Sequence, residues 1–229
     1  MDVACLQELA PNQARAVEAV LPHGKLEPAS DPADCSGMGI ALRRPGTVHH
    51  LSLRRRDARV VELLPEHWPE LPVPMEVLNL HVQAPHSRPP WRSFPERRAQ
   101  IRAVLRYLSQ VPLPHRVLAG DLNATPLWPA YRRLAELLGD APAQHARSRG
   151  ERPPRTWSPL PGWRPWLRID HVLVAGLGVA HSQVLPLAGS DHRALLVELE
   201  LPAPRPPPVR SGSRVASGRA RADRTSNPV

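Results

Sequence analysis

Residues Arg116-Val-Leu-Ala-Gly-Asp-Leu-Asn123 decide how the sequence is interpreted, because an apolar run passes directly into polar side chains. The apolar run predicts a short buried strand. Polar residues just after such a strand are where α/β proteins commonly build binding sites, so Asp121 and Asn123 are candidate site residues. An ordinary turn is the alternative interpretation, because Asp and Asn side chains also bond their own backbone in turns.

Strand-like and helix-like patterns alternate on both sides of this stretch. Apolar strand patterns occupy residues 2–6, 37–42, 60–64, 75–82, 167–175, 179–185 and 193–201. Helical patterns occupy residues 12–21, 97–108 and 134–138. In the helix over 97–108, Ile101, Val104 and Leu108 share one face, and Ser93 stands where an N-cap is expected. Strands outnumber helices and the helices cluster between groups of strands, which predicts an α/β or α+β protein built in layers.

The composition excludes several classes of protein. The 229 residues are 41% hydrophobic and 22% charged, which is too apolar for a wholly disordered chain. No apolar run reaches about 18 residues and no signal peptide is visible, so a cytoplasmic protein without a transmembrane helix is expected. The two cysteines exclude a disulfide framework. Two reduced thiols are expected, with one Cys5–Cys35 bridge as the alternative.

The composition changes after Leu201, which predicts a folded domain over 1–201 and a disordered tail over 202–229. The tail holds six arginines and one aspartate, hence +5 of the net charge of +9, together with six prolines. Such a segment buries too little apolar surface to order itself. An acidic surface, either a phosphate backbone or acidic lipid, is its candidate partner; a merely solvated tail is the favoured alternative. Because 29 of the 30 basic residues are arginine, a coding bias weakens the basic charge as evidence for nucleic acid.

Five short segments place polar residues at expected strand ends. They are Leu6-Gln-Glu8, Asn79-Leu-His81, Gly120-Asp-Leu-Asn123, Arg168-Ile-Asp170-His171 and Gly189-Ser-Asp191-His192. Each segment alone has an ordinary interpretation as a cap, a turn, a core histidine or a local ion pair. Together they supply the carboxylate and amide oxygens that Mg²⁺ prefers, and histidines suited to a phosphate group. An Asp beside a histidine also fixes its tautomer and supports its positive form.

These five segments, in this order, resemble the endonuclease/exonuclease/phosphatase superfamily, the metal-dependent phosphoesterases with a deoxyribonuclease-like fold. The resemblance covers about residues 1–201 and implies an α/β fold in four layers, a two-sheet sandwich flanked by helices. It also implies Mg²⁺ or Mn²⁺ as cofactor and a phosphoester as substrate. We expect the protein to be a monomer. A strand that precedes Leu6-Gln-Glu8 in the family has no counterpart here, so we expect the N-terminal strand to be missing. If further residues precede this sequence, a membrane anchor is an additional expectation.

The resemblance also implies roles for single residues. Metal ligands are expected at Glu8, Asp121 and Asp191, and water is positioned by Asp121 with Asn123. Phosphate is expected to be contacted and neutralised by His81 and His192, with Asp170 as the partner of His192. General acid is a further role for His81, and the choice of general base between Asp121 and His192 stays open. Candidate substrate-binding residues are Asn123, Trp157 and Arg88. Packing on the sheet is the equal alternative for Trp157, and a solvated charge is the stronger one for Arg88. Structural packing is expected for His171.

The function that follows from this resemblance is divalent-metal-dependent phosphoester hydrolysis, with water attacking a phosphodiester or phosphomonoester. Two alternatives stay open. One is a catalytically degenerate domain that binds nucleic acid or a membrane through its arginine-rich face and tail. The other keeps the chemistry and changes the substrate to a lipid or inositol phosphate, because loops around the cleft decide substrate in such folds.

Overall fold

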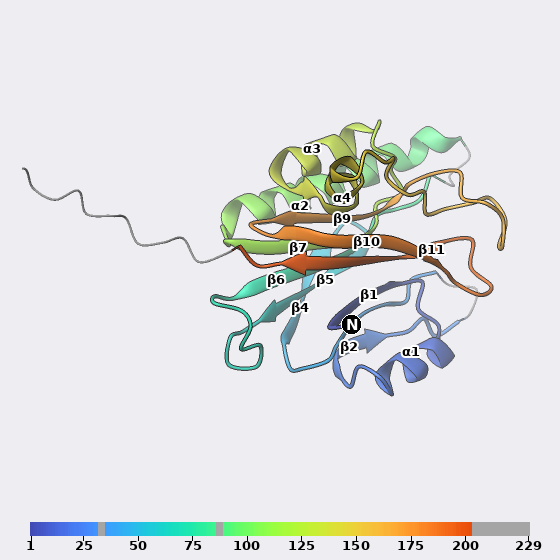
Figure 1. Cartoon of the computed structure of the whole chain (residues 1–229). Coiled ribbons are helices and arrows are strands. Elements are labelled where there is room, and N and C mark those ends of the chain that lie inside the picture. The colour runs from blue at the N-terminus through green and yellow to red at the C-terminus, as the bar shows by residue number, and fades with distance from the viewer. Residues whose placement is uncertain (32–34, 86–88, 203–229) are drawn as a thin grey trace, which may run out of the picture.

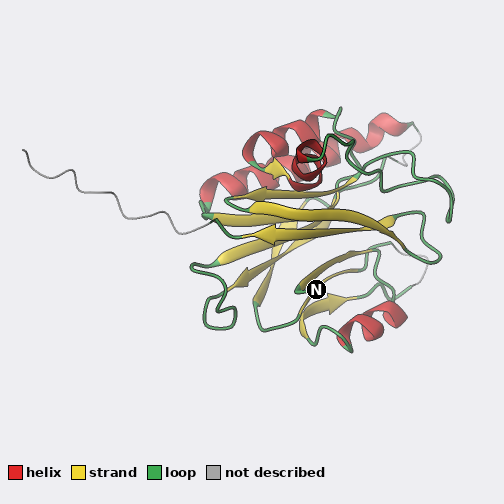
Figure 2. Cartoon of the chain, in the orientation of Figure 1, coloured by secondary structure: helices red, strands yellow, loops and turns green. Residues whose placement is uncertain are grey.

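A computed structural model of the chain describes residues 1–31, 35–85 and 89–202, and its strands form three sheets (Figure 1, Figure 2). The large sheet has the spatial order β4 (Thr47–Leu53), β5 (Arg56–Leu63), β6 (Met75–His81), β7 (His115–Asp121), β9 (Asp170–Ala175) and β8 (Gly139–Asp140). The strands β6 and β7 are parallel, and every other neighbouring pair in this sheet is antiparallel. The chain is therefore an α/β protein with a mixed central sheet.

Two smaller antiparallel sheets lie against one face of the large sheet. One has the order β1 (Val3–Gln7), β3 (Met38–Leu42) and β2 (His23–Glu27); the other pairs β10 (Gly178–Pro186) with β11 (Arg193–Glu200). Side chains from both small sheets join one core with the large sheet, for example Ile40, Val197 and Leu199 with Val117 and Val174. Within the described residues, β1 pairs only with β3 and β11 only with β10. Each of these two strands therefore keeps one edge without a strand partner there.

Helices cover the other face of the large sheet (Figure 1). The apolar faces of α2 (Phe94–Gln110) and α3 (Pro129–Leu137) pack on it through Ile101, Val104, Leu108 and Leu134. The helical face predicted from the sequence is thus the buried face of α2, and Ser93 is its N-cap residue. Of the shorter helices, α4 (Ala141–Ser148) packs against β9 and β10, and α1 (Pro11–Glu18) lies beside β2.

The differences between predicted and observed elements come from polar or short segments. The strands β2 and β4 were not predicted because their sequences, HGKLE and TVHHLSL, are polar and mostly half-buried or exposed. The two-residue strand β8 is too short to show a period, and α4 has only eight residues. The strand expected over 167–175 begins only at Asp170. Cys5 and Cys35 are not joined by a disulfide.

Two expectations lie outside the described residues: nearly all of the tail, at 203–229, and the candidate substrate residue Arg88. Within the described part of the chain, no helix is long and apolar enough to span a membrane.

Candidate active site

Strand register brings three of the predicted site residues to one level of the large sheet. Asp121 ends β7, and it pairs with His81 at the end of the parallel neighbour β6. On its other side Asp121 pairs with Asp170, the first residue of β9. Side chains paired across strands lie on the same face, so the three polar groups gather where the apolar part of the sheet ends.

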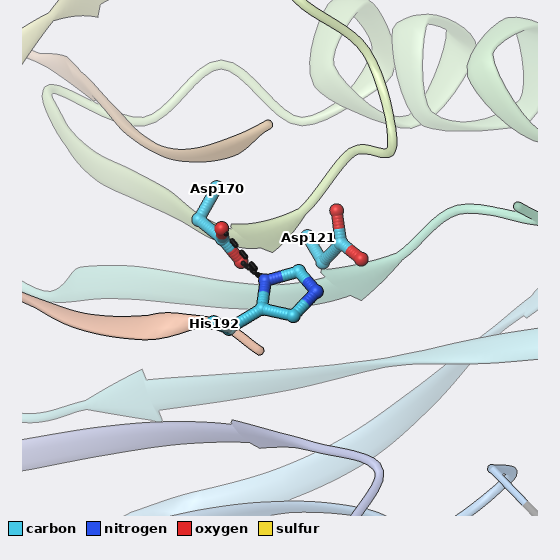
Figure 3. Close-up of side chains that lie close together, drawn as sticks. All are labelled: Asp121, Asp170 and His192. Carbon is cyan, nitrogen blue, oxygen red and sulfur yellow. Dashed lines mark hydrogen bonds and ion pairs between the residues drawn. The ribbon is translucent and has the colours of Figure 1, made fainter. Parts of the chain in front are cut away.

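Asp170 and His192 form an ion pair (Figure 3). The His192 ring, just before β11, places Nδ1 2.9 and 3.1 Å from the two carboxylate oxygens of Asp170. Burial opposes the positive charge, but the hydrogen bond and charge of Asp170, with the charges of Asp121 and Asp191, raise the pKa of His192 to about 9. His192 is therefore a cation at neutral pH, and its other ring nitrogen lies on the side of Asp121.

Asp121 and Asn123 form a tight turn at the end of β7. The carboxylate of Asp121 accepts hydrogen bonds from the Asn123 backbone N–H at 2.6 Å and from its side-chain amide at 2.8 Å. The same amide donates to the carbonyl of Val82, 3.0 Å away, so both of its protons are used. Asn123 has a φ of +49°, a left-handed conformation that Asn tolerates better than most residues. The segment therefore forms a turn, and the turn does not exclude Asp121 and Asn123 as site residues.

Asp121 lies in a crowded, negatively charged environment. Its side chain is buried, and burial with the nearby Asp170 carboxylate raises the pKa of Asp121 to about 7, although His192 and the Asn123 backbone work in the opposite direction. A carboxylate whose pKa is raised in this way accepts a proton from a bound water more readily than an ordinary carboxylate does.

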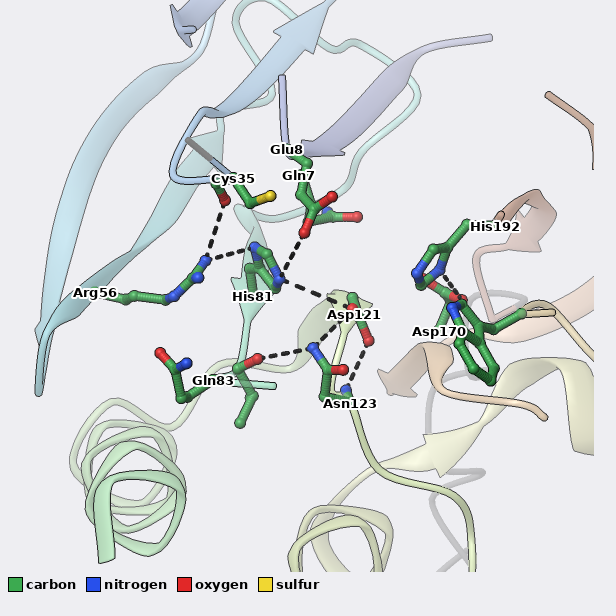
Figure 4. Close-up of polar contacts among 12 residues, drawn as sticks. Gln7, Glu8, Cys35, Arg56, His81, Gln83, Asp121, Asn123, Asp170 and His192 are labelled. Carbon is green, nitrogen blue, oxygen red and sulfur yellow. Dashed lines mark hydrogen bonds and ion pairs between the residues drawn. The ribbon is translucent and has the colours of Figure 1, made fainter. Parts of the chain in front are cut away.

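His81 is neutral, which differs from the expectation that it helps to neutralise phosphate charge. Burial, followed by the positive charges of Arg56 and His192, lowers the pKa of His81 to about 3. The guanidinium of Arg56 lies 2.8 Å from Nδ1 and can only donate, so we assign the ring proton to Nε2. That Nε2 lies 3.8 Å from an oxygen of Glu8 and 3.8 Å from an oxygen of Asp121 (Figure 4). His81 therefore offers a neutral N–H donor to the space between these carboxylates.

The two remaining predicted metal ligands, Glu8 and Asp191, come from different parts of the chain. Glu8 follows β1, is more than half exposed, and reaches His81 from the small sheet. Asp191 precedes His192, and its carboxylate accepts a hydrogen bond from the indole of Trp157 at 2.9 Å. The predicted substrate residue Trp157 therefore lies in the site, where it holds Asp191.

The donor set fits a hard divalent cation. Four carboxylates are close enough to influence one another or His192. The charges of Glu8 and Asp170 affect the pKa of Asp121, and those of Asp121, Asp170 and Asp191 affect the pKa of His192. A second candidate set, Asp121 with Asp170 and His192, has ligand atoms within 4.8 Å of one another. In that set, however, His192 is held as a cation by Asp170, whereas a metal needs the neutral ring. Oxygen ligands from Glu8 and Asp121 suit Mg²⁺ better, since this ion needs only one or two carboxylates besides waters and substrate.

Arg97 is a site-supporting residue that the sequence analysis missed. Its guanidinium is buried on α2 and donates to two carbonyls, 2.7 Å from that of Gln83 and 2.8 Å from that of Asn123. These carbonyls belong to the segments that follow β6 and β7. The guanidinium also lies over the ring of Trp128, 4.8 Å from its centroid. A usable signal was present, because Arg97 lies one turn before Ile101 on the apolar face of the helix.

Asn79 joins the large sheet to the small sheet that carries Glu8. It is fully buried, and its amide donates to the carbonyls of Leu6, at 2.9 Å, and Gly39, at 2.8 Å. Its oxygen accepts a hydrogen bond from the Gln7 side chain. The strand end that presents Glu8 is therefore tied to the strand that presents His81. The sequence did indicate a special role for Asn79, because it places an amide inside an otherwise apolar strand.

Thr156 and His171 support the site from behind. The Thr156 hydroxyl accepts from the backbone N–H of Asp170 at 3.2 Å, and its carbonyl accepts from that of Arg193 at 2.7 Å. Thr156 thereby ties Asp170 to the residue that follows His192. His171, expected to pack structurally, is buried and has Nε2 2.8 Å from the carbonyl of Ala124, directly after Asn123.

Comparison with known proteins gives the same assignment as the motifs. Residues 1–192 match the sequence model described as the endonuclease/exonuclease/phosphatase family. No curated protein matches the sequence. Among solved structures, the chain is similar to an endonuclease/exonuclease/phosphatase from Bacteroides vulgatus, with 18% identity, a TM-score of 0.63, and 88% of this chain and 85% of that one covered.

Two further solved structures have the same fold. The 3'-5' exonuclease NExo from Neisseria meningitidis is 19% identical, with a TM-score of 0.63 and coverage of 87% of this chain and 89% of that one. Humanized D. rerio TDP2 is 17% identical, with a TM-score of 0.63 and coverage of 87% and 85%. The match over residues 1–192 confirms the resemblance seen in the motifs: the chain belongs to the endonuclease/exonuclease/phosphatase family.

Proposed function

We propose that the protein is a divalent-metal-dependent hydrolase of phosphoesters in which water attacks phosphorus. One observation carries the proposal. Asp121 stands between a neutral histidine donor, His81, and a cationic histidine, His192, that is held by Asp170. Such a set of an acid–base group, a hydrogen-bond donor and a fixed positive charge is what phosphoryl transfer to water requires.

Each group has a role that follows from its position. Asp121, oriented by both N–H groups of Asn123, holds the attacking water and accepts its proton. His192 balances negative charge that develops on the phosphate oxygens, and His81 donates its Nε2–H to the same group. Glu8 and Asp121, with Asp191 next to His192 in the sequence, would hold Mg²⁺ or Mn²⁺, which would supply positive charge to the phosphate when bound.

The candidate substrate-binding residues belong to the proposal as well. Asn123 has both amide protons engaged, which leaves its side-chain oxygen to orient water or substrate. Trp157 orients Asp191, and stacking of its ring on the substrate stays a prediction. Arg88, outside the described residues, stays a prediction too. The substrate is a phosphoester. The similar structure from Neisseria meningitidis is named a 3'-5' exonuclease, which makes nucleic-acid ends one class to test.

We take the two small sheets as one layer, so that helices, large sheet, small sheets and α1 make up a four-layer sandwich. The support is that both small sheets pack on the same face of the large sheet. The unpaired edges of β1 and β11 are where a further strand would pair, which is the predicted missing strand.

Hydrolysis of bis-p-nitrophenyl phosphate tests the chemistry. We expect turnover with Mg²⁺ or Mn²⁺, its loss with EDTA, and its recovery when the metal is added back. The exposed His67 offers a control, since His67→Ala should leave the rate unchanged. Binding of a phosphoester without any metal-dependent turnover would support the degenerate domain instead.

A further inference from the structure

Large apolar side chains are exposed mainly around the active-site end of the molecule. Of the eleven such residues that are exposed within the described part of the chain, seven lie in segments that enter or leave the site strands. Four of them, which we call the apolar rim, are Leu160, Trp163, Trp166 and Leu187, each about half exposed. Trp91, after β6, and Leu127, after β7, are exposed further still. An exposed apolar group of this kind beside a site marks an interaction surface.

The apolar rim is continuous with the catalytic residues. Trp163 and Leu187 line one pocket together with Asp191 and His192. The ring of Trp166 lies 6.5 Å from that of Trp163. The segments that carry the rim, between α4 and β9 and between β10 and β11, both protrude at the same end of the molecule (Figure 1).

Backbone contacts hold the rim in place. The backbone N–H of Ser158 donates to the carbonyl of Asp191 at 2.9 Å, which ties the two rim segments together. The hydroxyl of Ser158 donates to the carbonyl of Leu160 at 2.7 Å, and the N–H of Trp166 donates to the carbonyl of Trp157, also at 2.7 Å. A partner that covers the rim therefore meets the opening of the active site.

The charges around the rim select the partner. Residues 152–169 contain four arginines and no Asp or Glu. Arg152, Arg155 and Arg164 are exposed, and Arg164 stands between the two rim tryptophans in the sequence. Tryptophan and arginine together suit the interface of a bilayer, where the indole lies among headgroups and the guanidinium binds lipid phosphate. Stacking on nucleic-acid bases would use the tryptophans but would gain nothing from exposed Leu160 and Leu187.

We propose that the protein docks its active-site end on an anionic phospholipid bilayer through the apolar rim. If the proposed function holds, on which this point rests, the substrate is a phosphoester held at that surface, such as a phospholipid headgroup. Docking itself needs no turnover, so the two statements can fail separately.

Vesicle binding of the full chain tests the docking. We compare vesicles of phosphatidylcholine containing phosphatidylglycerol with phosphatidylcholine alone, using wild type, the double variant Trp163→Ser/Trp166→Ser, and the control Val20→Ser/Leu137→Ser. The control residues are about as exposed or more so, but Val20 follows α1 and Leu137 ends α3. All three proteins keep residues 203–229, so charge on that segment cannot produce a difference between them. Brominated lipids report contact directly by quenching tryptophan fluorescence.

We expect wild type and control to bind the anionic vesicles, with quenching, and the tryptophan variant to bind about tenfold or more weakly. Hydrolysis of soluble bis-p-nitrophenyl phosphate should be equal in all three. Equal vesicle binding by wild type and the tryptophan variant would overturn the docking. A second result would also overturn it: wild type binds no vesicles, and the tryptophan variant loses binding to oligonucleotides. The apolar rim would then be a nucleic-acid surface. Tryptophan-dependent vesicle binding with no metal-dependent hydrolysis would support the docking and contradict the proposed function.

Discussion

His192 Nδ1 lies 2.9 Å from the carboxylate of Asp170, although 22 residues separate the two in sequence. The pair holds a positive charge beside Asp121, because the hydrogen bond and charge of Asp170 outweigh the burial that opposes protonation of His192. Removing the carboxylate should therefore remove the charge from the ring while leaving the ring in place.

Asp170→Asn is expected to lower kcat on bis-p-nitrophenyl phosphate by about a hundredfold or more, because an uncharged His192 no longer stabilises the phosphate oxygens. Steady-state kinetics with saturating Mg²⁺ measures the effect. The exposed Asp2 supplies the matched control, Asp2→Asn, which should behave as wild type. Equal kcat values for Asp170→Asn and wild type would show that the pair has no catalytic part.

Arg97→Lys is expected to lower kcat by about tenfold or more. A lysine ammonium keeps the positive charge but lacks the planar fork that reaches the carbonyls of both Gln83 and Asn123. The turn that positions Asp121 then loses one support, and the unfolding free energy should fall by about 1–3 kcal/mol. The adjacent exposed residue gives the control, Arg98→Lys. A variant that loses stability but keeps its kcat would leave Arg97 with a structural role alone.

Asp140→Asn is expected to destabilise the protein in a pH-dependent way. Burial opposes the charge of Asp140, but the His171 ring 3.7 Å away and the hydrogen bonds from Arg168 and Tyr131, with the charge of Arg168, hold the pKa of this carboxyl well below its usual range. Because the pKa is lowered in the folded state, the stabilisation is complete above about pH 4 and decreases as the pH falls further.

The Asp140→Asn variant should therefore be less stable by about 3 kcal/mol at neutral pH. The difference from wild type should shrink as the pH falls below about 4. Urea unfolding at several pH values measures it. A difference that is the same at about pH 7 and about pH 3 would contradict the assigned charge of Asp140.

Asn79→Leu is expected to cost about 3 kcal/mol of stability. The substitution conserves approximate size but leaves the buried carbonyl of Gly39 and the partly buried carbonyl of Leu6 without their donor. Because these contacts join the two sheets, Glu8 should also lose its fixed position, and the Mg²⁺ concentration for half-maximal activity should rise. Asn12→Leu, at an exposed position of α1, is the control. If the Asn79 variant kept the wild-type dependence on Mg²⁺, the contacts of Asn79 between the two sheets would not be what positions Glu8.

The sequence predicted those parts of the fold that depend on local pattern. The strand that ends at Asp121 and the apolar face of α2 follow from runs and periods within a few residues. The strands β2 and β4 were missed because their residues are polar, and only pairing with distant strands makes them regular.

The candidate site was predicted from motif order, but its electrostatics was not. The neutral state of His81 depends on Arg56, 25 residues earlier in the chain, and on burial that no local pattern records. Arg97 was hidden among 29 arginines, although its place on the apolar face of a helix distinguished it. The contact between Trp157 and Asp191 likewise joins residues that are 34 positions apart.

The kcat of Asp121→Ala on bis-p-nitrophenyl phosphate with Mg²⁺ tests the central claim most directly. Asp121 lies 3.8 Å from His81 and beside the Asp170–His192 pair. Because burial and the neighbouring carboxylate already make its charge unfavourable, its removal should change the melting temperature little. We predict a folded protein whose kcat is lower by about a thousandfold or more. Turnover at the wild-type rate in this variant would contradict the proposed active site.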